Sequence, residues 1–196
     1  RHYIAARTDV AAKYFEIALA LLPKWPKEMS TILFWLANCC YRTGLFKEGE
    51  KHLVQLAQAA EKNPSESTLI VGLARCVSNA IWVTGAAGKT EAMTTLLTFI
   101  EALALKNGDI VDFRRAYASG LANGVIGYGS AGKLTEMRLT LSPLETLAKD
   151  GHQWGDEKIQ DYLARAYSAA VHAYGQETSW LEMEELLTCL LVHAAS

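Results

Sequence analysis

The stretch "GAAGKT" at residues 85–90 is the part of this sequence that comes nearest to a phosphate-binding loop. Such a loop needs the pattern GxxxxGK[ST] after a β-strand, so that backbone N–H groups wrap the phosphates. Counting back from Gly88, Lys89 and Thr90 places Val83 where the first glycine must stand. The preceding segment has helical periodicity, and a related segment 44 residues later lacks the hydroxyl residue. We therefore expect no nucleotide site here and predict a corner between two helices.

Other residue types that support catalysis or metal binding are present, but their spacing matches no known catalytic or metal-binding motif. The five histidines form no HxxxH or HExxH motif, and no nucleophile elbow occurs in the sequence. Acidic pairs such as Glu184 and Glu185 stand near an expected helix start, where carboxylates favour the helix dipole. The sequence therefore predicts a protein that is not an enzyme and that has no cofactor and no metal site.

Length and composition favour one domain with a continuous core. The chain has 196 residues, of which 51% are hydrophobic, and a net charge of -2. Without a basic face to neutralise phosphates, we expect no nucleic-acid partner. The apolar runs are too short to span a bilayer, so we expect no membrane insertion. The four cysteines have no CxxC spacing, which favours buried thiols in a reducing compartment and predicts a cytoplasmic location.

An internal repeat organises the whole chain. "GAAGKTEAM" (85–93) matches "GSAGKLTEM" (129–137) at an offset of 44, which also relates Gly49 to Met93 and Met137. With helical periodicity throughout, the repeat predicts four units, each made of a first helix, a glycine turn and a second helix. The expected first helices are 28–43, 66–84, 110–128 and 157–174, the second helices are 46–62, 90–106, 134–149 and 180–194, and an unpaired helix covers about 8–22. The single domain 1–196 thus contains units at about 28–62, 66–106, 110–149 and 157–194.

Glycines and small residues indicate how the units pack. Four glycines are taken as equivalent turn residues: Gly44, Gly85, Gly129 and Gly175. Five residues before each stands a small residue that lets helices approach closely: Cys39, Ala80, Gly124 and Ala170. No helix pair buries enough surface alone, so stability must come from stacking. The sequence therefore predicts an all-α solenoid of antiparallel helix pairs with about nine helices, in which Pro143 kinks or splits one second helix near Ser142.

The first unit resembles a tetratricopeptide repeat. In "LFWLANCCYRTGLFKEGEKHLVQLAQAAEKNP" (33–64), the family's landmarks are matched by Leu36, Ala37, Tyr41, Gly44, Phe46, Gly49, Leu53, Leu56 and Pro64. The other units are longer, with 44 to 46 residues, and carry Met93, Met137 and Met183 where the family prefers a small residue. The resemblance implies a right-handed superhelix whose first helices line a concave groove. It also implies binding of peptides or proteins.

Repeated asparagines mark the candidate groove. Asn38, Asn79 and Asn123 stand six residues before the turn glycines, a position that the resemblance places on the concave face. Their amides could bind a peptide backbone, and arginines beside them could bind a carboxylate. The alternative is that these amides only bond a neighbouring helix. The candidate partner-binding residues are Phe34, Asn38, Arg42, Arg75, Asn79, Ser119, Asn123 and Arg165, whereas Trp35, Trp82, Tyr128 and Tyr174 are expected to pack in the core or between repeats.

Two functions remain open on the sequence. The favoured one is a protein–protein interaction scaffold that binds a peptide or protein segment of acidic or C-terminal character in the groove. The alternative is a structural or regulatory piece, such as a self-association or sensor domain of a larger regulator, without a peptide ligand. The last expected helix carries leucines around most of its circumference. It therefore predicts either a homodimer or membership of a longer chain.

Overall fold

The part of the chain that the structure describes contains eight helices and no strand. The computed structural model describes residues 13–14, 17, 26–154, 156–177 and 179–195. The helices are α2 (Pro26–Thr43), α3 (Phe46–Lys62), α4 (Ser67–Ala86), α5 (Thr90–Asn107), α6 (Val111–Ser130), α7 (Leu134–Trp154), α8 (Glu157–Gln176) and α9 (Trp180–Ala195). The all-α prediction is confirmed. The expected helix over 8–22 lies almost entirely outside the described residues.

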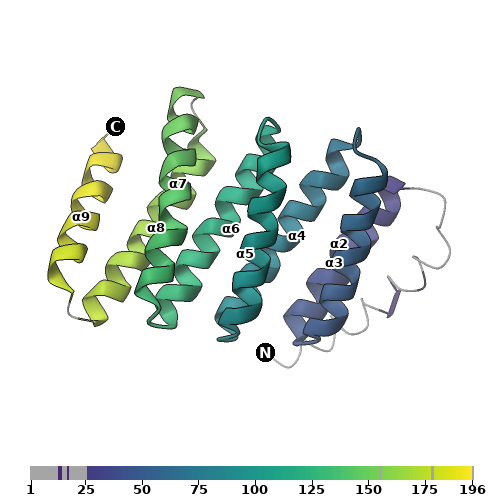
Figure 1. Cartoon of the computed structure of the whole chain (residues 1–196), viewed down its shortest axis with the longest axis horizontal. Helices are drawn as coiled ribbons and strands as arrows, with labels where there is room; N and C mark the ends of the chain where they lie inside the picture. Colours follow the sequence, from purple (N-terminus) through teal and green to yellow (C-terminus); the bar gives the residue numbers. More distant parts are fainter. Residues whose placement is uncertain (1–12, 15–16, 18–25, 155, 178, 196) are drawn as a thin grey trace.

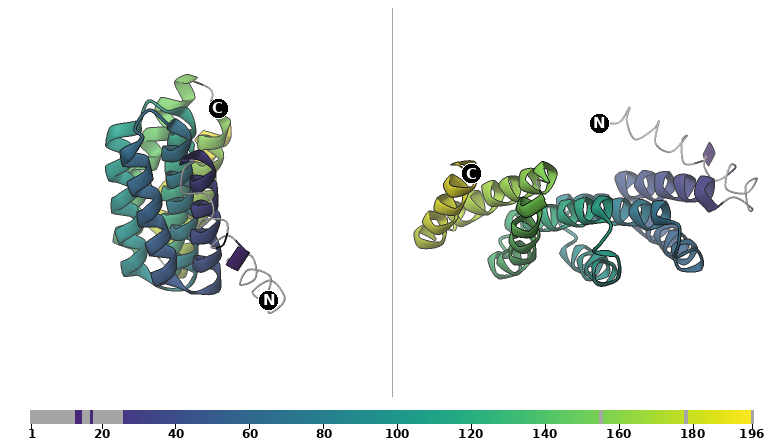
Figure 2. Two further views of the ribbon diagram at one scale, coloured as in Figure 1. Left: turned by 90° about the vertical axis from the view of Figure 1, so that its right-hand side faces the viewer. Right: turned by 90° about the horizontal axis from the view of Figure 1, so that it is seen from above.

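The helices form two layers (Figures 1 and 2). The first helices α2, α4, α6 and α8 pack side by side in one row, each against the next. Each second helix packs against its own first helix, and α3, α5 and α7 also touch the first helix that follows. These three lie on the same side of the row and do not touch one another. No described helix covers the other face of the row, which we call the open face.

Each first helix ends in the same hydrogen-bonded turn. The N–H groups of Leu45, Lys89, Lys133 and Ser179 bond to the carbonyls of Cys40, Thr84, Tyr128 and Tyr174, at 2.8–3.0 Å. The residue before the donor is a glycine with positive φ in three units: Gly44 (83°), Gly88 (69°) and Gly132 (67°). This is the Schellman arrangement, which needs a residue in the left-handed region. The turns fix which residues of the four units are equivalent.

The turns correct the register taken from the sequence. Gly85, Gly129 and Gly175 lie inside helices, so they are not equivalent to Gly44. The first unit was therefore aligned three residues out of place. Three residues are almost one helical turn, which is why Asn38 still shares a face with Asn79.

The glycines inside the helices receive bulky side chains from their partners. A Cβ on Gly85 would lie 2.9 Å from Met93 Sδ and 3.2 Å from Gly127 Cα, so α4, α5 and α6 meet there. Gly129 stands in the same relation to Met137. In the first unit the sizes are exchanged, because Tyr41 of α2 packs onto Gly49 of α3. Methionine in the longer units therefore fills the space that the glycine of the first helix leaves.

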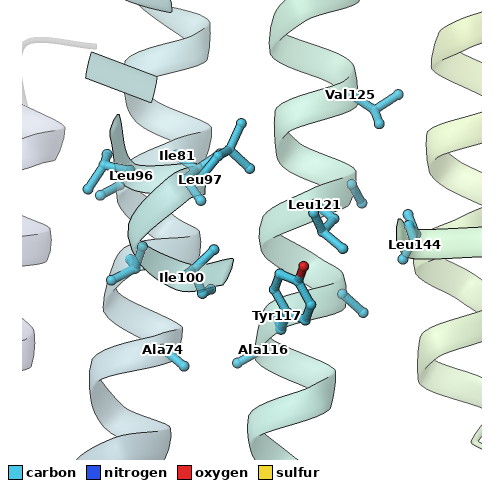
Figure 3. Packing of buried hydrophobic residues seen from close by; sticks show 14 of the residues in the cluster. Ala74, Ile81, Leu96, Leu97, Ile100, Ala116, Tyr117, Leu121, Val125 and Leu144 are labelled. Carbon is cyan, nitrogen blue, oxygen red and sulfur yellow. The ribbon is translucent and has the colours of Figure 1, made fainter. Parts of the chain in front are cut away.

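Leucine and isoleucine side chains of α5 fill the junction to α6, the first helix that follows (Figure 3). On α5, Leu97 and Ile100 are buried; a Cβ on Gly124 of α6 would lie 2.9 Å from Leu97 Cδ1, and one on Gly120 would lie 3.2 Å from Ile100 Cδ1. Glycine at these two positions lets the helices approach closely. The core is thus continuous from unit to unit.

Two further expectations, on Pro143 and on the cysteines, have different outcomes. The helix α7 runs without a break through Pro143, so the helix is not split there. None of the four cysteines forms a disulfide bond; Cys40 and Cys76 are buried as expected, but Cys189 is exposed. Burial raises the pKa of the Cys76 thiol to about 12.

Among the described helices, α4 is long and apolar enough to cross a membrane by length and composition. This corrects the expectation that every apolar run is too short. The most apolar window of α4 is 56% buried inside the protein, where the helix packs against α2, α3, α5 and α6. A central core helix satisfies the same criteria, and packing within the fold accounts for the hydropathy of α4.

Candidate functional site

The open face carries side chains of first helices that point away from the second helices. Arg42, Arg75, Asn79 and Arg165 are exposed, as the groove interpretation requires. Trp35 and Trp82, which were expected to pack in the core or between repeats, are also exposed and are therefore not part of the core. Tyr128 and Tyr174, in contrast, are buried. The open face therefore offers aromatic and cationic side chains together.

A cleft of about 670 Å³ crosses the part of this face where α4 and α6 begin. Phe34 and Trp35 form one wall, with their rings edge to face and the centroids 5.3 Å apart. Val71 and Gly72 of α4 contribute apolar surface, and Arg75 lies one turn further along the same helix. The full lining is Ser30, Thr31, Phe34, Trp35, Ser67, Thr68, Val71, Gly72, Arg75, Ile110, Val111, Asp112 and Arg115.

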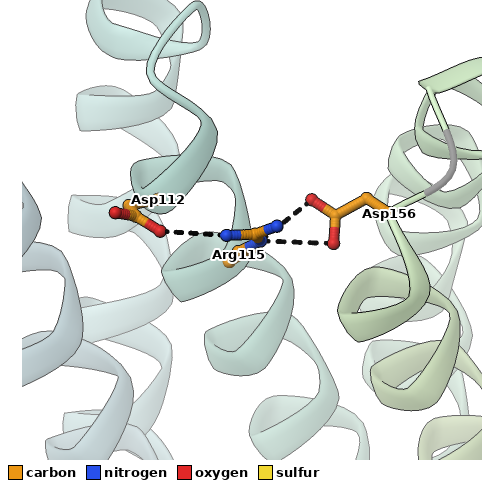
Figure 4. A network of polar contacts seen from close by, with 3 residues as sticks. All are labelled: Asp112, Arg115 and Asp156. Carbon is orange, nitrogen blue, oxygen red and sulfur yellow. Dashed lines mark hydrogen bonds and ion pairs between the residues drawn. The ribbon is translucent and has the colours of Figure 1, made fainter.

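The two arginines of the cleft differ in their partners. Arg115 donates to Asp156, with Nε 3.1 Å from Oδ2, and to Asp112, with Nη1 3.2 Å from Oδ1 (Figure 4). These hydrogen bonds, the one to Asp156 first, raise the pKa of the Arg115 guanidinium. Arg75 forms no ion pair or hydrogen bond with any described side chain. Its charge is therefore available to a carboxylate from outside.

The pair of Arg115 and Asp156 also holds two units together. Asp156 precedes α8 and is buried, whereas Arg115 belongs to α6. A buried carboxylate is unfavourable without a partner, so the guanidinium compensates for its desolvation. We assign this pair to the junction between the third and fourth units rather than to ligand binding.

The predicted asparagines bond neighbouring helices. Asn79 Nδ2 donates to Asn38 Oδ1 at 2.9 Å, and Asn38 Nδ2 donates to the carbonyl of Phe34 in its own helix at 2.7 Å. Asn123 Nδ2 donates to the carbonyl of Ser78 at 3.0 Å. Asn38 and Asn123 are buried, while Asn79 is exposed. All three amides thus take part in hydrogen bonds between α2, α4 and α6, which is what the alternative interpretation expects.

The structure brings only part of the predicted set into the cleft. Of the eight, only Phe34 and Arg75 line the cleft, and Arg42 and Arg165 lie outside it. The other four form hydrogen bonds between the first helices: Asn38, Asn79, Ser119 and Asn123. Ser78 Oγ donates to Ser119 Oγ at 3.0 Å, so this hydroxyl pair also joins α4 to α6. Arg165 lies on α8, with Cζ 5.9 Å from the ring centroid of Tyr162.

Sequence reasoning missed Thr68, Asp112 and Arg115, all of which line the cleft. The signal was present, because Val71 and Thr68 stand one and two turns, respectively, before Arg75 on the same helix. Asp112 and Arg115 stand in the first turns of α6, where the cleft opens.

The "GAAGKT" segment forms the corner between α4 and α5. Gly88 has positive φ, and Lys89 immediately precedes α5. The Lys89 ammonium lies 3.9 Å from the ring centroid of Phe46, at the start of α3, where it makes a cation–π contact. The residues of this segment therefore have structural roles in the turn. Among the described residues, no group of three or more His, Cys, Asp or Glu side chains is arranged to hold a metal ion.

Scans against protein-family models, curated proteins and solved structures find no match to this chain.

Proposed function

We propose that this protein is an interaction scaffold that binds an extended peptide segment with an acidic group on the open face. The observation that carries the proposal is the cleft of about 670 Å³, where exposed Arg75 has no partner among the described side chains. Aromatic surface from Phe34 and Trp35 lies in the same cleft. A ligand that combines a carboxylate with an apolar side chain satisfies both features.

The proposal includes the arrangement of the units as a tetratricopeptide-like solenoid. Four equivalent hydrogen-bonded turns and the unbroken row of first helices support a repeat architecture. In such an architecture the first helices present a long surface, which suits an extended segment. A binding role of this kind needs no catalytic group, cofactor or metal.

Selection of peptides from a random library displayed on phage tests the proposal. We expect the selected peptides to share an acidic residue or a free C-terminal carboxylate next to an apolar residue. The affinity of a selected peptide is then measured by fluorescence anisotropy for the wild type and for Arg75→Glu. Loss of one charged hydrogen bond is worth about 1.5–3 kcal/mol, which corresponds to at least about a tenfold weaker complex.

Lys51→Glu is the matched control, because Lys51 is exposed on α3, which lies on the other side of the row. The control changes the net charge by the same amount and should leave the affinity unchanged. Equal affinity of the wild type and Arg75→Glu would remove Arg75 from the site. Peptides selected without any acidic group would contradict the proposed ligand.

A structural or regulatory role without a peptide ligand is the second candidate, and the asparagine contacts favour it. If the amides of Asn38 and Asn123 serve only to join helices, their presence in the first helices is explained without a bound ligand. The same selection separates the two functions, because a purely structural domain yields no peptide whose binding depends on Arg75.

A further inference from the structure

The last helix repeats a surface that every earlier second helix buries. Counted from the donor of each turn, the same position is leucine in all four units: Leu53, Leu97, Leu141 and Leu187. The first three are 5%, 9% and 0% exposed, whereas Leu187 is 38% exposed. One turn further, Leu56, Ile100 and Leu144 are fully buried, and the equivalent Leu190 is only partly buried. Burial is therefore lost at the fourth unit alone.

The kind of helix that would cover the leucines of α9 can be inferred from the earlier units, because α3, α5 and α7 each contact the first helix that follows. Leu97 and Ile100 lie against Gly124 and Gly120 of the following first helix. The equivalent residues of the other following first helices are also small and buried: Cys76 and Ala80 on α4, and Ala166 and Ala170 on α8. Two small residues four apart lie on one face of a helix and let it approach closely. No described helix follows α9 in this way.

The fourth unit also differs from the third at the position directly after Leu190. This difference indicates which residue a helix packed against α9 should carry there. Glu145 of α7 accepts a hydrogen bond from the Tyr167 hydroxyl of α8 at 3.1 Å. The residue of α9 that is equivalent to Glu145 is Leu191, which is 70% exposed. A helix that covers α9 should therefore carry an apolar residue where α8 carries Tyr167, since leucine offers no acceptor to a hydroxyl group.

The first helix α2 of a second copy of this chain is not suited to cover α9. At the positions of the two small residues, α2 carries Ile32 and Leu36, which are bulky and already buried. The face of α2 equivalent to the small-residue faces of α4, α6 and α8 is thus neither small nor available.

We propose that Leu187, Leu190 and Leu191 form a docking surface for an amphipathic helix of another protein. That helix carries two small residues four apart, with a large apolar residue directly after the first. It takes the place of a following first helix and extends the row of stacked helices by one. The surface belongs to α9, whereas the cleft lies on α2, α4 and α6, so the inference does not depend on the peptide-binding proposal.

A peptide copied from the chain itself is a suitable probe. It has the sequence of residues 157–176 with Tyr167 replaced by leucine, and it carries a fluorophore at its N-terminus. We expect saturable binding to the full chain by fluorescence anisotropy. A second peptide with Ala166→Leu and Ala170→Leu in addition should bind at least about tenfold more weakly, because its bulky residues prevent close approach.

Variants of the protein locate the surface. Leu187→Glu and Leu191→Glu should each weaken binding at least about tenfold. Leu139→Glu is the control, since Leu139 is a similarly exposed leucine of α7 outside these positions. It should bind like the wild type. Because Leu191 is the more exposed of the two, Leu191→Glu decides the matter if Leu187→Glu fails to fold by circular dichroism.

Several results would overturn the proposal. These are no saturable binding by the wild type, equal binding of the two peptides, or binding that Leu191→Glu leaves intact. Sedimentation velocity of the protein alone could give a further contradicting result. If the protein alone forms a dimer that Leu191→Glu dissociates, a second copy covers α9 and the proposed partner is wrong.

Discussion

Asn79 of α4 donates a hydrogen bond from Nδ2 to Oδ1 of Asn38 on α2, at 2.9 Å. Asn38 in turn donates to the carbonyl of Phe34, whose ring lines the cleft. The amide pair therefore sets the spacing of α2 and α4 below the open face. It connects packing to binding, because the cleft wall and Arg75 belong to these same two helices.

The amide pair should be measurable as a coupling between two residues. A double-mutant cycle with Asn38→Ala and Asn79→Ala should give a coupling energy of about 0.5–1.5 kcal/mol in urea unfolding, the usual net value of one hydrogen bond. Asn107→Ala combined with Asn38→Ala is the control, because Asn107 Nδ2 bonds only within its own helix, to Leu103. Additive effects of Asn38→Ala and Asn79→Ala would show that this contact contributes nothing to stability.

The close approach of α4 and α6 predicts opposite effects for two glycines. A Cβ on Gly127 would collide with Met93 Sδ and lie 3.2 Å from Gly85 Cα, so Gly127→Ala should destabilise the fold by about 1–3 kcal/mol. Gly72 has no atom within 4 Å of the added Cβ, and Gly72→Ala should stabilise by about 0.4–1 kcal/mol. Urea unfolding measures both.

The collision at Gly127 has its own check. Adding Met93→Ala to Gly127→Ala removes the sulfur that the new methyl group meets. The double variant should therefore be less destabilised than the sum of the single variants. A Gly127→Ala protein as stable as the wild type would mean that the helices do not meet at this point.

Alkaline pH should destabilise the protein through Tyr117. Burial, with a smaller effect of the Glu101 charge, raises the pKa of Tyr117 to about 12, from the usual value of about 10. The folded state thus favours the neutral phenol. Its contribution to stability is complete below pH 10 and is lost as the pH rises toward 12.

Replacing Tyr117 by phenylalanine tests this contribution. From pH 10 to 12, the free energy of unfolding of Tyr117→Phe should fall by about 2 kcal/mol less than that of the wild type. Below pH 10 the pH dependence of the two proteins should agree. Parallel pH profiles up to pH 12 would show that the Tyr117 hydroxyl is not shielded from solvent.

Much of the fold could be predicted because glycine punctuation and helical periodicity are local signals. The bounds of the described helices agree with expectation to within two residues, except that α7 continues to Trp154 rather than ending at 149. The sequence could not distinguish Gly85 from Gly88 as the turn residue, since both are glycines near a helix end. That choice depends on which one adopts positive φ and which one receives Met93.

The candidate site was less predictable, for a physical reason. Repetition drew attention to the asparagines, but a repeated residue can serve packing between repeats, as Asn123 does toward Ser78. Phe34 and Arg75 were found through the resemblance to tetratricopeptide repeats. The exposure of Trp35 depends on which face of the row the second helices leave uncovered, and no local pattern encodes this.

The nuclear magnetic resonance spectrum of the ¹⁵N-labelled protein, recorded with and without a peptide selected for binding, tests the central claim most directly. The account predicts that amide shifts change in three segments that line the cleft: 30–35 of α2, 67–75 of α4 and 110–115 where α6 begins. The amides of α3, α5 and α7 should keep their positions, and Arg75→Glu should abolish the changes. Changes confined to the second helices, or changes that survive Arg75→Glu, would contradict it.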